Sequence, residues 1–163
     1  MVKVIYPGTF DPISYGHMDL VGRALKMFDH VTVAVATGCG KRSLFDESER
    51  FKLTQSIFRN HKNVSVMQFN GLLVDVIEDV GAVAVLRGLR AVSDFEYEFQ
   101  MASINRRLNK KIETIFLTPD DRYTCLSSTM IREVAMIDPS RVGEFVCDEV
   151  LEALRFKFNS AIK

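Results

Sequence analysis

The residues that could do chemistry are concentrated in one short stretch, residues 8–17, which reads GTFDPISYGH. The apolar run 2–6 before it predicts a buried strand, and apolar residues at helical spacing after it predict a helix. The stretch should form the turn between them. The first turn of a helix presents free N–H groups and the positive end of the helix dipole, which together bind anions. We therefore expect a phosphate site here, with Thr9 and His17 reaching into it.

Other polar and basic groups follow the remaining apolar runs of the chain. They are Lys41 and Arg42 after 31–36, Arg87 and Arg90 after 83–86, and Ser127 and Ser128 after 113–117. In open parallel sheets, ligands bind outside the carboxyl ends of the strands. If these runs form parallel strands, hydroxyls, a histidine and several cations meet at one edge of the sheet. This combination of groups favours a polyphosphate ligand such as a nucleotide.

The pattern of the whole chain predicts an α/β fold. Apolar runs typical of buried strands alternate with helical patterns, and this order is typical of parallel sheets covered by helices. We expect a Rossmann-like, doubly wound parallel sheet of five strands with helices on both faces, formed by a single domain over residues 1–163. The expected strands are 2–6, 31–36, 64–69, 83–86 and 113–117, and the expected helices include 47–59, 72–80 and 148–158.

Local signals mark the expected ends of two helices. Asp46 and Glu49 have the spacing of a capping box before a helical run. Asp94 is expected to cap the helix that follows the fourth strand. In that helix Phe95 and Phe99 share a face, which we interpret as part of the core.

The composition limits the class of protein. Hydrophobic residues make up 47% of the 163 residues, which is enough for a core and too many for a disordered chain. The 21 basic and 21 acidic residues cancel, whereas general nucleic-acid or membrane-surface binders usually carry a basic excess. The three cysteines lack metal-binding spacing, and no apolar run approaches the ~20 residues of a membrane helix. We expect no signal peptide before the first strand. We expect a soluble cytoplasmic protein that binds neither nucleic acid nor membrane.

The candidate groups are donors and cations rather than bases. The chain has neither the GxxxxGK[ST] loop of P-loop kinases nor the GxGxxG of dinucleotide-binding proteins. Phosphoryl and nucleotidyl transfer depend largely on positioning and on stabilising charge, which such groups can provide. A phosphate nucleophile is already ionised and needs no general base. His17 and Lys41 would then stabilise charge on the reacting phosphorus as pyrophosphate leaves.

Three segments carry a resemblance to a known family: GTFDPISYGH at 8–17, RGLRAVSDFEYE at 87–98 and SSTMIRE at 127–133. Together they resemble phosphopantetheine adenylyltransferases over essentially the whole chain. The first segment is shared with the wider nucleotidylyltransferase superfamily, and the second is the more specific one. The resemblance implies transfer of the adenylyl group of ATP to 4′-phosphopantetheine, giving dephospho-coenzyme A and pyrophosphate. It also implies Mg2+ on the ATP phosphates, a homohexamer, and coenzyme A as feedback inhibitor.

The resemblance also implies roles for single residues. Thr9 is similar to the threonine that contacts phosphates of both substrates, His17 to the transition-state stabiliser, and Lys41 to the lysine that orients the acceptor phosphate. Leu73 and Arg87 match acceptor-binding positions, and no protein side chain is expected to bind the metal. With Thr9 and His17, the ATP site would comprise Phe10, Gly88, Leu89, Arg90, Glu98, Tyr123, Thr124, Cys125, Leu126, Ser127, Ser128 and Thr129.

Other interpretations stay open at this point. The same chemistry would serve a different acceptor, such as nicotinate mononucleotide, or cytidylyl transfer to a phosphorylated alcohol. A nucleotide-binding sensor could keep the fold without catalysis. The single signals also have structural explanations, since Arg87 and Arg90 could pair with the acidic residues at 94, 96 and 98, and Ser127 could be only a helix cap.

Overall fold

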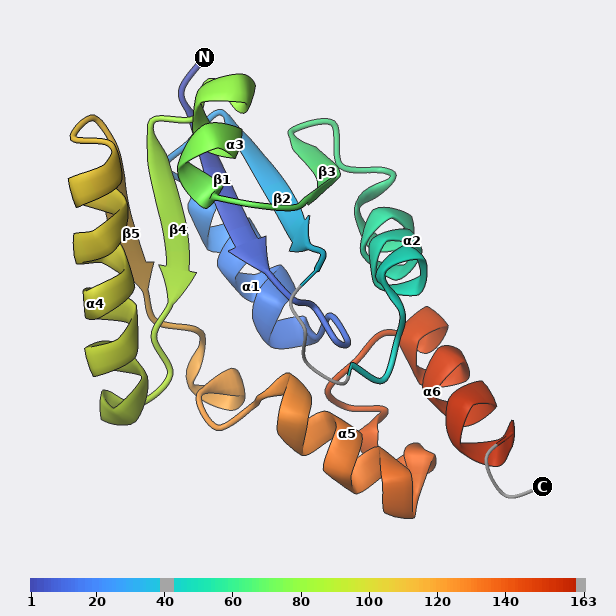
Figure 1. Cartoon of the computed structure of the whole chain (residues 1–163). Coiled ribbons are helices and arrows are strands. Elements are labelled where there is room, and N and C mark those ends of the chain that lie inside the picture. The colour runs from blue at the N-terminus through green and yellow to red at the C-terminus, as the bar shows by residue number, and fades with distance from the viewer. Residues whose placement is uncertain (39–42, 161–163) are drawn as a thin grey trace.

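A sheet of parallel strands forms the centre of the computed structural model, which describes residues 1–38 and 43–160 (Figure 1). Its strands lie in the order β3-β2-β1-β4-β5, so that β1 is central and the winding reverses between β1 and β4. Ligands of such sheets bind beside this reversal, outside the carboxyl ends of the strands. The five-stranded parallel sheet expected from the sequence is confirmed. The strands are β1 (Lys3–Gly8), β2 (His30–Ala36), β3 (Val64–Phe69), β4 (Ala84–Gly88) and β5 (Glu113–Leu117).

Helices connect the strands and continue beyond the last one. Short 3-10 turns at 121–123 and 139–142 precede and follow α5. No helix of the described ranges is both long enough and apolar enough to span a membrane. The helices are α1 (Tyr15–Ala24), α2 (Glu47–Phe58), α3 (Leu73–Val80), α4 (Val92–Leu108), α5 (Ser128–Ile137) and α6 (Asp148–Ser160).

The start of α2 shows why the sequence signals placed the helices well. Asp46 Oδ1 accepts a hydrogen bond from the Glu49 N–H at 2.8 Å, and Glu49 Oε2 accepts one from the Asp46 N–H at 2.8 Å. These two bonds satisfy donors that otherwise have no partner at the start of a helix. At the end of α3, Gly81 has a φ of +64°, a left-handed conformation that glycine adopts without strain.

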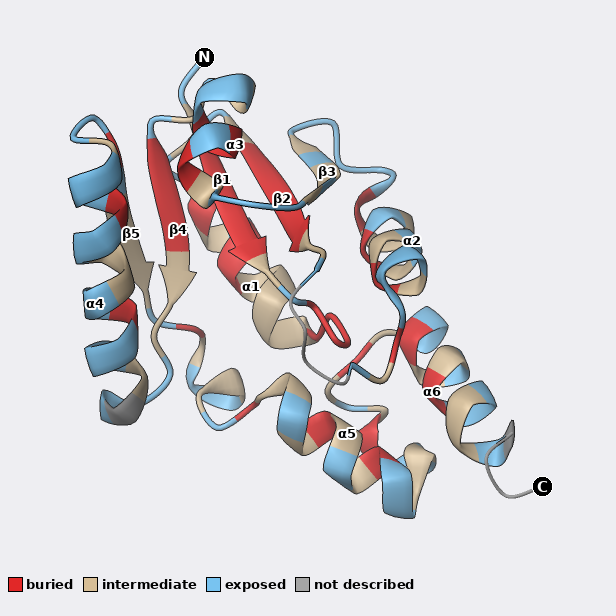
Figure 2. Ribbon diagram, viewed as in Figure 1, coloured by how far each residue is buried: buried red, intermediate tan, exposed pale blue. Residues whose placement is uncertain are grey.

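Side chains alternate along the strands and divide the core into two clusters. Val4 and Tyr6 of β1 belong to a cluster that packs against α1, α2, α5 and α6. Ile5, which points to the opposite face, packs with residues of α3. Figure 2 shows that the central strands are buried along most of their length. Burial on both faces fixes the strand register, and thereby the relative positions of the loops at the carboxyl edge.

Two expectations about α4 are wrong. The helix begins at Val92 with Ala91 as its N-cap, so Asp94 lies inside the first turn, where its carboxylate binds Arg90 rather than the helix end. Phe95 and Phe99 are 49% and 55% exposed and stack on each other with ring centroids 5.7 Å apart. The helical spacing correctly placed both rings on one face. Within the described residues that face is covered only in part, by contacts such as that of Phe95 with the Phe116 ring of β5 at 6.4 Å.

Candidate active site

A cavity of about 380 Å³ opens at the carboxyl ends of β1 and β4. Its lining comes from the loop after β1, the first turn of α1, the end of β4 and the first turn of α5. Both helix starts face the same space, so their dipoles add to one positive field. The volume falls in the usual range of small-molecule sites, ~300–1,000 Å³.

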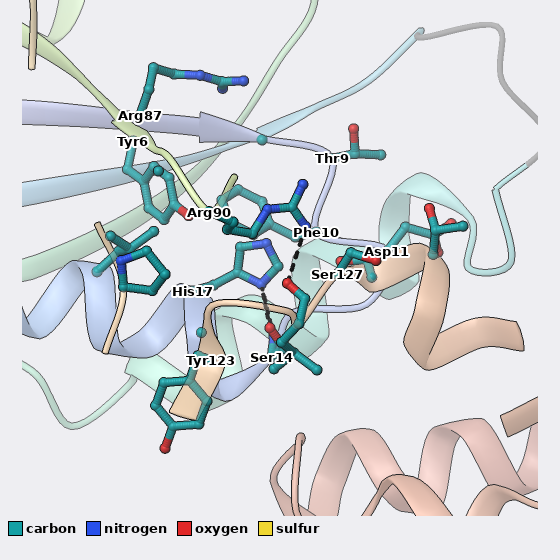
Figure 3. A pocket seen from close by; sticks show the side chains of 18 of the residues that line it. Tyr6, Thr9, Phe10, Asp11, Ser14, His17, Arg87, Arg90, Tyr123 and Ser127 are labelled. Carbon is teal, nitrogen blue, oxygen red and sulfur yellow. Dashed lines mark hydrogen bonds between the residues drawn. The ribbon is translucent and has the colours of Figure 1, made fainter. Parts of the chain in front are cut away.

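The geometry of His17 defines which ring nitrogen carries a proton. Its Nδ1 atom accepts a hydrogen bond from the Ser14 backbone N–H at 3.0 Å and lies 2.9 Å from Ser14 Oγ. A backbone N–H can only donate, so Nδ1 is unprotonated and the proton of the neutral ring sits on Nε2. The ring packs edge-on against Phe10 at 5.1 Å (Figure 3). His17 therefore offers an N–H donor of fixed orientation.

The electrostatic surroundings keep His17 neutral. Burial of the ring lowers the pKa of His17 from 6.5 to about 4, and the positive charges of Arg90 and Arg87 act in the same direction. At neutral pH the imidazole is therefore uncharged and carries its proton only on Nε2. It can donate a hydrogen bond, and it is not poised as a cation.

The loop after β1 has an unusual backbone conformation. Phe10 has a φ of +49°, which is rare for a bulky residue and typically costs ~1–3 kcal/mol. The Phe10 ring lies over Gly8, where an added Cβ would come within 2.9 Å of it. Only glycine at position 8 leaves room for this ring. Strained residues of this kind are concentrated at functional sites, and the strain supports the assignment of this loop to the site.

Asp11 ties this loop to two other segments. Asp11 is buried, with 3% of the residue exposed. Its carboxylate accepts hydrogen bonds from the backbone N–H groups of Leu44 and Phe45, both at 2.9 Å. Arg132 of α5 lies 3.4 Å from the same carboxylate and also donates to the Asp11 carbonyl. Because its oxygens are engaged in this way, Asp11 is a structural anchor of the site.

Two arginines stand at the carboxyl end of β4, Arg87 in the strand and Arg90 just after it, and both are paired with carboxylates of α4. Arg87 donates from Nε and Nη2 to the two oxygens of Glu98 at 2.7 and 2.6 Å, and from Nη1 to the Pro7 carbonyl at 2.7 Å. Arg90 donates to Asp94 at 3.1 Å and to the Leu126 carbonyl at 3.1 Å. The ion network considered as a structural alternative is therefore present. Both side chains nevertheless line the cavity.

The first turn of α5 uses its serine hydroxyls to fix its own position. Ser127 Oγ accepts from the Met130 N–H at 3.1 Å and caps the helix, as the sequence indicated. Ser128 Oγ donates to the Pro12 carbonyl at 2.8 Å and joins α5 to the loop after β1. The backbone N–H groups of Ser128 and Thr129 in this turn are the donors that a ligand phosphate can use.

The donor set of the cavity suits an anion. Within residues 1–38 and 43–160 there is no cluster of three or more histidine, cysteine or carboxylate side chains that could hold a metal ion. Asp11 and Glu98, the acidic side chains that line the cavity, are bound to arginines and backbone N–H groups. The remaining groups that face the cavity are N–H donors and cations, which match phosphate oxygens.

Comparison with known proteins identifies the family. A family model described as cytidylyltransferase-like matches residues 5–134. A phosphopantetheine adenylyltransferase from Francisella philomiragia subsp. philomiragia is 52% identical over 160 residues, which cover 98% of this chain and 99% of the relative. One from Francisella tularensis subsp. mediasiatica is 51% identical over 155 residues, 95% of this chain and 96% of the relative. This chain belongs to the phosphopantetheine adenylyltransferase family.

Solved structures share the fold at lower identity. A nicotinic acid mononucleotide adenylyltransferase from Plasmodium falciparum, complexed with NaAD, has a TM-score of 0.69 at 14% identity and covers 98% of this chain and 97% of its own. A lipopolysaccharide core biosynthesis protein from Thermoplasma volcanium has a TM-score of 0.55 at 22% identity, covering 74% of this chain and 99% of its own. At these identities the likeness is one of fold alone.

The cavity brings together most residues that match the site of the phosphopantetheine adenylyltransferase family. Lys41 lies outside the described residues, and its role stays a prediction. Leu73 packs beside the apolar cluster under α3, and the Leu89 N–H is bound to the Leu117 carbonyl at 2.9 Å. Leu73, Leu89, Thr124 and Cys125 are not among the lining residues. The predicted residues that do line the cavity are Thr9, Phe10, His17, Arg87, Gly88, Arg90, Glu98, Tyr123, Leu126, Ser127, Ser128 and Thr129.

Some lining residues were missed when the site was assigned from the sequence. Tyr6 lies in the strand that was assigned to the core, and burial raises the pKa of its hydroxyl well above the ordinary value. Asp11, Ser14 and Arg132 stand inside the quoted motifs but act through neighbours rather than as obvious ligand groups. Their position in the motifs was the available signal. Their partners became visible only in the folded chain.

Proposed function

We propose that this protein transfers the adenylyl group of ATP to 4′-phosphopantetheine, forming dephospho-coenzyme A and pyrophosphate in coenzyme A biosynthesis. The observation that carries this proposal is the 52% identity to a phosphopantetheine adenylyltransferase over 98% of the chain. The cavity supports the chemistry independently, because two helix starts, a neutral histidine donor and several arginines surround one space. All of these groups favour a polyphosphate.

The proposed reaction is a direct in-line displacement. An oxygen of the acceptor phosphate attacks the α-phosphorus of ATP, a new P–O bond forms, and the bond between the α-phosphorus and the bridging oxygen of the β-phosphate breaks. The electron pair leaves with pyrophosphate, and no proton has to be removed from the nucleophile. His17 donates its Nε2 proton in a hydrogen bond to the reacting phosphate, where negative charge is concentrated in the transition state.

The other groups divide between the two substrates in this proposal. Thr9 contacts phosphates of both, and Lys41, Leu73 and Arg87 bind the acceptor. ATP is bound by the backbone at Phe10, by the start of α5 and by the remaining residues of the family site. The Arg87 fork is held by Glu98, so an acceptor phosphate meets an arginine that is already oriented.

We propose that Mg2+ enters with ATP, bound to phosphate oxygens. The engaged state of Asp11 and Glu98 supports this, because neither carboxylate is free to replace a phosphate ligand. When bound, the ion neutralises part of the charge on the phosphates and makes pyrophosphate a better leaving group. The residues of this chain orient the nucleotide through N–H donors and arginine charges.

The test is release of pyrophosphate from ATP and Mg2+ with 4′-phosphopantetheine as acceptor. One control replaces 4′-phosphopantetheine with nicotinate mononucleotide and tests the alternative acceptor. A second control replaces ATP with CTP and tests the alternative nucleotide. We expect turnover with ATP and 4′-phosphopantetheine only. Turnover with nicotinate mononucleotide but not with 4′-phosphopantetheine would refute the proposed acceptor, and nucleotide binding without any turnover would favour the sensor.

Self-association belongs to the same proposal. Exposed apolar side chains lie along α4, among them Tyr97, Phe99 and Leu108 at 62%, 55% and 55% exposure. Apolar surface of this extent commonly marks an interface. We propose a homohexamer in the cytoplasm, inhibited by coenzyme A as the end product. Light scattering tests the mass, and a pyrophosphate assay with added coenzyme A tests the inhibition.

A further inference from the structure

Arg50 is a buried arginine that contacts the backbone of a cavity residue, Thr9, and is not itself part of the lining. It lies on α2 and is 2% exposed. Its Nη1 group donates to the Thr9 carbonyl at 2.6 Å and to the Ala36 carbonyl at 2.8 Å. One nitrogen thus joins the loop after β1 to the end of β2. It also keeps the Thr9 carbonyl bound to α2, so that this oxygen does not face an anion in the cavity.

The charge of Arg50 has no counter-charge in the described part of the chain. No carboxylate there lies within ion-pair distance of it, and residues 39–42 contain no acidic side chain. Its Nε is a buried nitrogen without a hydrogen-bond partner. Burying an unpaired charge is unfavourable, and such groups normally have a partner. By contrast, Arg87, Arg90 and Arg132 at the cavity are all paired.

We propose that Arg50 is a positioning residue of the nucleotide site, which orients Thr9 through its carbonyl and whose charge is balanced by the phosphates of the bound nucleotide. This inference rests on the proposed function for the identity of the nucleotide. The carbonyl contacts supply the orientation. Because no carboxylate neutralises Arg50, its positive charge remains available to attract an anion. A buried cation next to an anion site strengthens anion binding, since water screens the charge poorly there.

The test compares binding of MgATP and of inorganic tripolyphosphate by calorimetry. Arg50→Met removes the charge and both hydrogen bonds while filling a similar volume, and we expect at least a tenfold loss of affinity for both probes. Arg50→Lys keeps the charge but not the planar fork, and we expect a loss of about threefold. In the pyrophosphate assay, KM for ATP should rise more than kcat falls, a split that a general loss of stability would not produce.

Two matched variants on the same helix separate this role from general effects. Lys52→Met removes an exposed positive charge two residues away, and Thr54→Val removes a buried hydroxyl that donates to the Arg50 carbonyl at 2.8 Å. Both should bind the two probes within twofold of the unchanged protein. Equal affinity of Arg50→Met and the unchanged protein would overturn the inference while turnover still supported the proposed function. If Arg50→Met binds both probes more weakly but the unchanged protein uses another acceptor, only the proposed function would be overturned.

Discussion

On the α4 side of the cavity, Arg87 and Arg90 are each paired with a carboxylate, whereas Arg50 on the α2 side is buried without one among the described residues. The paired side is balanced in the free protein, and its arginines are held ready in a fixed orientation. The other side keeps an uncompensated charge that is hydrogen-bonded to the Thr9 carbonyl. The difference indicates that the free protein lacks a negative charge near Arg50, and that the phosphates of a bound ligand would supply this charge.

The largest expected effect tests the neutral donor. His17→Ala removes the Nε2 proton donor, and turnover should fall by ~10²–10³ because one donor to the transition state is lost. MgATP affinity should stay within a few-fold, since the arginines and helix starts still bind the phosphates. Steady-state kinetics and calorimetry measure the two quantities. Turnover like that of the unchanged protein would remove His17 from the mechanism.

The next effect concerns the paired side. Arg87→Met leaves the buried carboxylate of Glu98 uncompensated, so unfolding in urea should show a loss of about 2 kcal/mol. This is less than the ~3–5 kcal/mol for a fully buried pair because the Arg87 side chain is 29% exposed. The double variant with Glu98→Gln should regain most of this loss. If the double variant is no more stable than the single one, the pair does not act as a unit.

A smaller change in stability is expected on the unpaired side. Arg50→Met loses two hydrogen bonds to carbonyls but leaves no carboxylate behind and removes a buried charge, so these terms oppose each other. We expect a loss of about 1 kcal/mol or less in the same urea experiment. A loss larger than that of Arg87→Met would mean that Arg50 has a counter-charge in the free protein, and the comparison between the two sides would fail.

The last prediction concerns pH dependence. The pKa of His17 is lowered from 6.5 to about 4 in the folded protein, so the unfolded chain binds more protons between these values. The stabilising contribution is therefore complete above pH 6.5 and is lost as the pH falls toward 4. In an NMR titration of the free protein, the His17 ring should be the Nε2-protonated tautomer with a midpoint near 4. A midpoint near 6.5, or a proton on Nδ1, would contradict the geometry.

Much of the fold followed from the sequence. The strands at 64–69 and 113–117 and the capping box of α2 were placed correctly because local apolar patterns and caps act within a few residues. Phe95 and Phe99 show the limit of this reasoning. Their spacing places them on one face of a helix, but whether that face is covered depends on packing that the local pattern does not contain.

The sequence by itself determined the parallel α/β order and the family motifs, including Thr9 and His17, because these depend on residue types at fixed short spacing. Only the tertiary structure decided which buried residues contact and orient these motifs. Arg50, Thr54 and Phe58 form the buried stripe of α2, and an arginine in such a stripe looks like a surface residue in the sequence. Its role arises because α2 packs beneath two strand ends, whose carbonyls come from residues 14 and 41 positions away. Contacts between segments that far apart exist only once the chain has folded.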